Sequence, residues 1–360
     1  MDRRMMSYEQ LESVWPVHGS VLVENDKVYC VAGRTVFLDG GMRLLQLNPR
    51  TGEKISEKVL DNIDPNTGKD LQFLSVSLDM PVGLNDILSS NGKHFYMRSQ
   101  EFDMDGNRTF IGVRDLKDQT GEGVHVFSPI GFLDDSQFFR SYMMYGKSVK
   151  GGWGSWEMMG KLTPSGRIIA VDDNTVYGFS RKPEFYSESV VVDFQLYAAE
   201  MAGDKAATEK ITAQPEKIDA FNKGLFNYAG DWKLRQGIPR DEQTAVNYKW
   251  KVDDPSFQAR ALLVSGDTMF AAGPPDVISE EEAFFALDDQ AVRDKLAEQS
   301  AALKGKDGSI MWAVDTKTGK KLAEYKMESM PVWDGMAAAN GSIVMTTMDG
   351  DVVCYSGKGI

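Results

Sequence analysis

A nine-residue pattern occurs twice in this chain, as LNPRTGEKI at residues 47–55 and as VDTKTGKKL at residues 314–322. In both copies an apolar run leads into Asn or Asp, whose side chain can bond the backbone two residues on. The Gly that follows can take the positive φ that closes a hairpin loop with a bulge. An active-site motif usually occurs once per site, whereas a structural motif occurs once per repeat. The pattern therefore predicts the same hairpin turn in two repeats of one architecture.

A third copy of this turn, DPNTGKDL at residues 64–71, begins only 16 residues after the first copy (64 − 48). This spacing is too short for another full repeat. We therefore expect another turn of the same chemistry.

A second pattern also predicts a repeated sheet, because a short polar turn is followed by an apolar strand at five places. Units of this kind that recur along a chain indicate antiparallel sheets. Successive turns lie 66 to 92 residues apart, whereas a plain propeller blade takes roughly 40–50 residues, so we expect insertions. The prediction is an all-β fold, a β-propeller of about five to eight blades, as a single domain spanning residues 1–360. The five turns belong to segments 24–33, 90–99, 172–180, 264–273 and 339–350.

Two insertions are expected to be helices or loops. Residues 279–304 open with Ser279 and Glu282 in the spacing of a helix capping box, and apolar residues follow at helical intervals. Residues 198–224 are rich in Ala, Lys and Glu, which favours an exposed helix or a mobile loop. Neither has an apolar stripe wide enough to lie on a membrane, so we expect them to cap the propeller or to contact a partner.

The charge balance limits the kinds of partner. Forty Lys and Arg residues stand against 53 Asp and Glu residues, so the formal net charge is 40 − 53 = −13. No basic run offers a face for nucleic acid or for an anionic membrane. No apolar stretch approaches the ~18 residues of a membrane span, and the start MDRRMMSYEQ lacks the apolar core of a signal peptide. We expect a cytoplasmic protein or a piece of a longer precursor.

The two cysteines, Cys30 and Cys354, lie in the apolar contexts VYCVAG and VVCYSG. Two cysteines are too few for a four-cysteine zinc site, and no CxxCH sequence could attach a haem. Two buried free thiols in strands are therefore the preferred interpretation. A disulfide between the first and last segments is the alternative.

The turn DxxTGK after an apolar strand resembles the blades of PQQ-like propellers, as in quinoprotein dehydrogenases. Four further stretches resemble runs in bacterial PQQ-binding-like β-propeller repeat proteins, and the first three cover about 120 residues in the same order. The resemblance implies a PQQ-like β-propeller, commonly the C-terminal part of a longer secreted or envelope protein. A periplasmic or cell-envelope location is then expected. The stretches are VWPVHGSVLVENDKVYCVAGRTVFLDGGMRLLQLNPRTG, residues 127–186, AGPPDVISEEEAFFALDD and DGMAAANGSIVMTTMDGDVVCYSGK.

The chain also departs from quinoproteins. Their blades usually carry a Trp shortly after TGK that locks neighbouring blades, whereas Tyr325 is the nearest aromatic residue here. The adjacent cysteines on which methanol-type quinoprotein dehydrogenases stack the quinone are also missing. We therefore expect no cofactor, with PQQ and Ca²⁺ as the alternative. The expected function is a binding or scaffold module of the cell envelope; the alternatives are a quinone-dependent dehydrogenase, a carbohydrate-active propeller enzyme, or a sensor domain of a larger polypeptide.

Two segments carry candidate binding residues. The stretch AGRTVFLDGG places Arg34 and Asp39 in a strand connection of the kind that gathers at a propeller rim. They either contact a ligand or partner, or form a salt bridge that shapes the loop. Residues 138–156 contain several aromatic side chains and one Arg. These aromatic side chains could stack on a sugar or bind a protein partner, or they could fill the space between neighbouring blades. The expected partner is a protein or a small neutral ligand such as a carbohydrate, and the candidates in this segment are Arg140, Tyr142, Trp153 and Trp156.

No motif identifies catalytic residues or a metal site. The three histidines, His18, His94 and His125, lack metal-ligand spacing, and no GxSxG elbow is present. DMDGNRTF at residues 103–110 begins like a calcium loop, but Arg stands where the EF-hand pattern needs its Gly and its final Glu. We expect a turn there.

Overall fold

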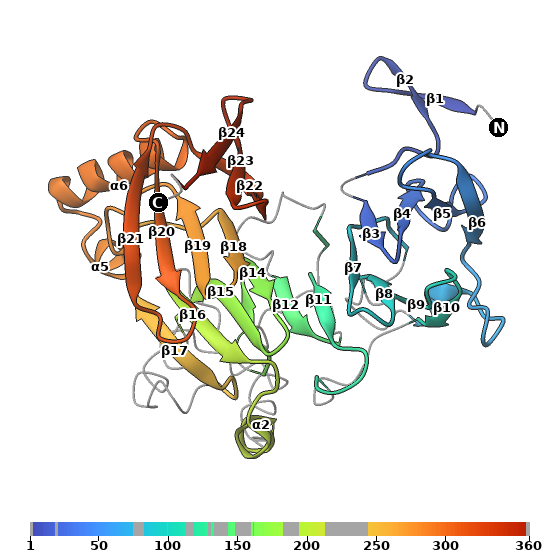
Figure 1. Ribbon diagram of the computed structural model, residues 1–360, viewed down its shortest axis with the longest axis horizontal. Coiled ribbons are helices and arrows are strands. Elements are labelled where there is room, and N and C mark those ends of the chain that lie inside the picture. The colour runs from blue at the N-terminus through green and yellow to red at the C-terminus, as the bar shows by residue number, and fades with distance from the viewer. Residues whose placement is uncertain are drawn as a thin grey trace. The chain divides into compact units, whose positions relative to one another are not determined.

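The computed structural model describes residues 3–18, 21–74, 83–98, 100–111, 119–128, 131–132, 143–147, 160, 162–182, 194–212 and 244–357. The chain forms two compact units, Met1–Trp156 and Glu157–Ile360, and each unit is described by itself. The single domain expected for residues 1–360 stays a prediction. Within the described ranges, the strands form seven antiparallel sheets, four of which have four strands in chain order (Figure 1).

The first unit begins with a two-stranded hairpin, followed by two four-stranded sheets and a further strand pair. The hairpin consists of β1 (Arg4–Ser7) and β2 (Gln10–Ser13). The first four-stranded sheet consists of β3 (Leu22–Glu24), β4 (Lys27–Ala32), β5 (Met42–Leu47) and β6 (Lys54–Leu60). The second consists of β7 (Leu88–Ser90), β8 (Phe95–Met97), β9 (Gln100–Phe102) and β10 (Arg108–Phe110). Between the two sheets lies the 3-10 helix Leu71–Leu74, and after them β11 (His125–Phe127) pairs with β12 (Met143–Gly146).

The second unit opens with the short strand β13 (Ser165–Gly166) and then forms two four-stranded sheets and one three-stranded sheet. The first sheet consists of β14 (Ile168–Val171), β15 (Thr175–Arg181), β16 (Phe194–Glu200) and β17 (Tyr248–Asp253). The second consists of β18 (Ala261–Ser265), β19 (Thr268–Gly273), β20 (Ser309–Asp315) and β21 (Lys321–Met327). The third consists of β22 (Pro331–Ala339), β23 (Ser342–Thr347) and β24 (Val352–Ser356).

Successive sheets of one unit bury their faces against each other. One cluster joins the sheets β14–β17 and β18–β21 and includes Phe179, Leu196, Met269 and Val314. A second cluster joins β18–β21 to β22–β24, and a third joins the two four-stranded sheets of the first unit. Each fully buried apolar side chain of this size contributes roughly 1.5–3 kcal/mol. The chain therefore has the all-β fold that was predicted, built of stacked antiparallel sheets of the propeller-blade type.

The repeated nine-residue pattern forms the predicted turn. The side-chain oxygen of Asn48 accepts from the N–H groups two and three residues on, at 2.8 and 3.1 Å, and that of Asp315 does the same at 3.2 and 2.8 Å. The N–H of Gly52 or Gly319 donates to the Asx carbonyl oxygen at 2.9 Å, and the glycine φ is 74° or 71°. The third copy, at Asp64, repeats these bonds.

A tryptophan locks the second copy of this turn to the neighbouring sheet. Trp250 lies on β17, and its Nε1–H donates to the carbonyl oxygen of Thr316 at 2.8 Å. The ring lies so close to Gly319 that a Cβ there would stand 2.7 Å from ring carbon Cδ2. No Trp follows TGK in this turn, but Trp250 of the preceding sheet makes a contact that joins the two neighbouring sheets.

The calcium-like segment is a turn, as expected. Asp103 Oδ1 accepts from the N–H groups of Asp105 and Asn107, at 3.0 and 2.8 Å, between β9 and β10. The turn also ties its sheet to the preceding one, because the carbonyl oxygen of Met104 accepts from Tyr29 Oη at 3.0 Å.

Residues 279–304, expected to be a helical or loop insertion, contain two helices with a break between them. Ser279 caps α5 (Glu280–Phe285) by accepting from the N–H of Glu282 at 3.2 Å. Asp289 caps the longer helix, α6 (Gln290–Leu303), in the same way. In the segment 198–224, also expected to be an insertion, residues 198–200 pair within β16 and the described helix is α2 (Lys205–Thr212). Residues 213–224 lie outside the described residues.

The two cysteines are free thiols in strands, but only Cys30 is buried. Cys354 is exposed because it lies on β24, at the edge of a three-stranded sheet where nothing described covers it. The expectation of two buried thiols was therefore wrong for Cys354.

Candidate functional site

The predicted pair Arg34 and Asp39 lies in the connection between β4 and β5. The two side chains form an ion pair, and the Asp39 carboxylate also lies 3.4 Å from Arg3 Nη1. Asp39 has a φ of 58°, and two glycines with positive φ follow it. The contacts are those of a salt bridge that shapes a glycine-bounded loop. The other four predicted residues, Arg140, Tyr142, Trp153 and Trp156, lie outside the described residues.

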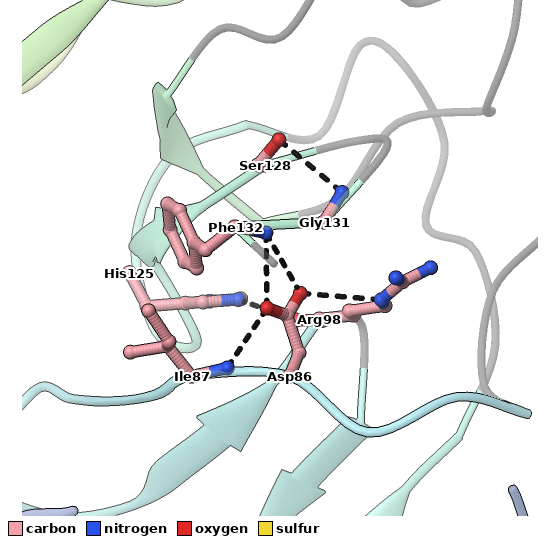
Figure 2. Close-up of polar contacts among 7 residues, drawn as sticks. All are labelled: Asp86, Ile87, Arg98, His125, Ser128, Gly131 and Phe132. Carbon is pink, nitrogen blue, oxygen red and sulfur yellow. Dashed lines mark hydrogen bonds and ion pairs between the residues drawn. The ribbon is translucent and has the colours of Figure 1, made fainter. Parts of the chain in front are cut away.

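A buried polar cluster in the first unit is centred on Asp86, directly before β7 (Figure 2). The Asp86 side chain is 0% exposed, and its carboxylate accepts from the N–H groups of Ile87 and Phe132 at 2.8 and 2.9 Å. Arg98 Nε donates to it at 3.2 Å. Burial raises the pKa of Asp86, and the nearby Arg98 charge partly opposes this rise. The acid is thus held by the chain's own donors.

Histidine and glycine complete this cluster. Both ring nitrogens of His125 face carbonyl oxygens, Nδ1 that of Gly123 at 2.9 Å and Nε2 that of Arg98 at 3.0 Å. Both bonds form together only when the ring carries two N–H protons. A Cβ at Gly131 would stand 2.3 Å from Arg98 Nη2, and the φ of Gly131 is 112°, so a larger residue there would strain the backbone and displace the Arg98 guanidinium. The members bind one another, which indicates that the cluster fixes the ends of β7, β8 and β11.

Asp86 stands at a position that recurs in the second unit. In its sheet the polar turn after the first strand opens at residue 91, five residues after Asp86 (91 − 86). In the second unit the corresponding turns open at residues 172, 265 and 339. The residues five positions before them are Arg167 (172 − 167), Arg260 (265 − 260) and Asp334 (339 − 334). The backbone N–H groups of Arg167 and Arg260 make the same bond, to the carbonyl oxygen of the facing strand, at 2.9 and 2.8 Å. The first strands β14, β18 and β22 lie beside each other in this order (Figure 1). Arg167 and Arg260 therefore stand directly before β14 and β18, whereas Asp334 lies within β22, at the register shift between Pro331 and Met336.

Arg167 lies between two aromatic rings. Its guanidinium carbon stands 5.4 Å from the ring centre of Phe194 and 5.5 Å from that of Trp333. Its Nη1 lies 3.5 Å from Oε1 of Gln258, which is at the limit of a hydrogen bond. Cation–π contacts of this kind hold the side chain in place.

Arg260 and Asp334 lack such contacts. Within the described ranges, Arg260 Nε is buried without a hydrogen-bond partner and the guanidinium has no ion pair; burial lowers the pKa of this side chain. Asp334 donates its backbone N–H to the Arg260 carbonyl oxygen at 2.8 Å and has a φ of 54°. Burial raises the pKa of its carboxyl to about 6.

Asp334 is solvent-accessible although its carboxyl is desolvated. By surface area the residue is exposed, yet enough protein surrounds the carboxyl to disfavour its charged form. Exposure of the residue and a raised pKa of its carboxyl are compatible when water reaches the carboxyl from one side only. Trp333 beside it keeps 39% of its surface exposed. Together, Arg260, Trp333 and Asp334 form what we call the strand-end site.

The strand-end site was not predicted from the sequence, although a signal was present. Aligning the polar turns and reading five residues upstream brings Arg167, Arg260 and Asp334 into one column with Asp86. No single copy shows this pattern, because the residue type differs between copies. Only the comparison of repeats marks the position.

No family model matches the chain, and no curated protein matches it. A solved structure of BamB from Moraxella catarrhalis is similar to it with a TM-score of 0.37 and 9% sequence identity, over 94% of this chain and 70% of that chain. At this similarity the match supports no inference about function.

Proposed function

We propose that this chain is a binding module that holds a ligand or partner at the strand-end site without transforming it. The observation that carries the proposal is the contrast between Asp86 in the first unit and two equivalent positions in the second unit, Arg260 and Asp334. Asp86 in the first unit is surrounded by its own donors, whereas Arg260 and Asp334 have no ion pair within the described part of the chain. Charged groups that the fold leaves unmatched are available for a ligand to match.

The cofactor expected as the alternative fits the described residues poorly. A calcium ion of the kind that accompanies PQQ needs several oxygen ligands gathered in one place. Among the residues that the structure describes, no group of three or more His, Cys, Asp or Glu side chains could hold a metal. None of the described helices is long and apolar enough to cross a membrane. The expected location in the cell envelope remains part of the proposal.

The proposal is tested by separating binding from turnover. The full chain is titrated with PQQ, with and without Ca²⁺, in a redox-dye assay, and is screened by thermal shift against small carboxylates, sugars and peptides. We expect no dye reduction, and stabilisation by at least one compound that is lost in Arg260→Met. Arg293→Met, on the exposed face of α6, is the matched control and should bind as the unmodified chain does. Saturable PQQ binding with dye reduction would overturn the proposal.

A further inference from the structure

The strand-end site contains three chemically different groups within neighbouring residues. Arg260 offers a guanidinium whose Nε is buried and unbonded within the described ranges. Asp334 offers a carboxyl that accepts hydrogen bonds, and Trp333 offers a partly exposed aromatic ring. A ligand that matches all three must carry an anionic group, hydroxyl donors and an apolar face.

Arg260 determines the charge of the ligand. A guanidinium binds planar oxyanions through two parallel N–H···O bonds, and a carboxylate has the matching geometry. The position before β18 brings the backbone of Arg260 next to that of Asp334, which donates to its carbonyl oxygen. A doubly charged phosphate beside the Asp334 carboxyl would suffer more repulsion than a singly charged carboxylate. The arrangement therefore favours a carboxylate.

Trp333 and Asp334 determine the remainder of the ligand. The Arg167 guanidinium packs over the Trp333 ring and fixes its orientation. The C–H face of a sugar ring packs on an exposed aromatic ring of this kind, and its hydroxyl groups donate to a carboxyl. Asp334 is held in the left-handed region, with a φ of 54°, by its backbone bond to Arg260. Trp333 and Asp334 are consecutive residues of β22, and both are exposed.

We propose that the strand-end site binds a carboxylated sugar, a hexuronic acid or an oligosaccharide that contains one. The Arg260 guanidinium takes the carboxylate, Asp334 accepts from hydroxyl groups, and Trp333 packs against the ring. This inference rests on the proposed binding function and replaces the small neutral ligand that was one of the two partners expected from the sequence. No bond of the sugar is broken.

The experiment is calorimetric titration of the full chain with trigalacturonate and with a matched trisaccharide whose carboxyls are reduced to alcohols. We expect trigalacturonate to bind at least tenfold more tightly than the reduced sugar, since the carboxylate contact is charge-assisted. Arg260→Met keeps the apolar stem but lacks the charge, so it should bind the two sugars equally. Arg293→Met should retain the full preference, and a melting curve for each variant confirms that it folds. Asp334→Asn should weaken both sugars by a similar factor.

The outcomes separate this inference from the proposed function. Equal affinity of the unmodified chain for both sugars, or no binding of either, overturns the carboxylated-sugar inference. So does a preference for trigalacturonate that survives Arg260→Met. A tetraglutamate peptide is the third ligand: if it binds through Arg260 and the sugars do not, the inference falls while the proposed binding function stands. If no compound in either screen distinguishes Arg260→Met from Arg293→Met, both fall.

Discussion

Replacing Asp334 with Asn is expected to stabilise the protein at neutral pH. The pKa of the folded-state carboxyl is about 6, against about 3.9 for Asp in an unfolded chain. Between these values the folded chain binds more protons than the unfolded chain, so the free energy of unfolding falls as the pH rises from about 4 to about 6. Above pH 6 the Asp334 carboxyl is ionised in the folded chain although it is desolvated, and this lowers the free energy of unfolding by the full amount. Asn cannot ionise, so the Asn variant avoids this loss.

The size of this effect follows from linkage. A difference of about two pKa units corresponds to ~2.9 kcal/mol, and the exposure of Asp334 reduces this to about 1 kcal/mol because solvent screens the charge. At pH 4.5 about one third of the penalty remains, or about 0.3 kcal/mol. Asn tolerates a φ of 54° as well as Asp does, so the substitution adds no backbone strain.

Hydrogen exchange of the full chain measures the effect locally, in peptides that cover residues 331–347 of β22 and β23. At pH 7.5 Asp334→Asn should exchange about fivefold more slowly than the unmodified chain, after correction for intrinsic rates. At pH 4.5 the ratio should fall below twofold. Asp349→Asn, on the exposed turn between β23 and β24, is the matched control and should show no such pH-dependent ratio. A ratio that does not change with pH, or faster exchange in Asp334→Asn at pH 7.5, would refute the reasoning.

Three further predictions concern the contacts between and within the sheets. Gly319→Ala should cost at least about 2 kcal/mol more than Gly52→Ala in urea unfolding, because both glycines have a similar positive φ but only the first lies against Trp250; equal costs would contradict the lock. Trp250→Phe should cost about 1–3 kcal/mol, from the lost Nε1–H bond and the smaller ring, and a value near zero would show that the bond contributes nothing. Asp86→Asn should cost about 3–5 kcal/mol, because it removes one charge of the buried ion pair between Asp86 and Arg98; a cost below about 1 kcal/mol in thermal unfolding would contradict this role.

Local chemistry made the turns predictable from the sequence. The Asx residue and the Gly of TGK complete their hydrogen bonds within six residues, so nothing outside the motif is needed to specify it. The cap at Ser279 is equally local, since it bonds three residues on. Recurrence of such local units was enough to predict an all-β fold of repeated antiparallel sheets.

Contacts between distant residues were not predictable in this way. Trp250 and Thr316 are 66 residues apart (316 − 250), and nothing near either residue marks the other as its partner. The exposure of Cys354 depends on which strand lies at the edge of its sheet, which the apolar context VVCYSG does not reveal. Asp334 shows the same limit, because its raised pKa comes from atoms that only the folded sheet brings around it.

The position of Trp250 has a consequence for the order in which the second unit folds. Its strand, β17, pairs with β16, but 47 residues separate Glu200 from Tyr248 (248 − 200 − 1). Closing a loop of this length costs about 2 kcal/mol more in chain entropy than closing a four-residue turn. The hairpins β14–β15 and β18–β19 can form by pairing outward from their own tight turns. Pairing of β17 with β16 is slower, because it needs contact between segments that are far apart in the sequence. Trp250, one of the residues that join the two sheets, therefore arrives after each sheet has begun to form, so its bond to Thr316 is a late event in their assembly.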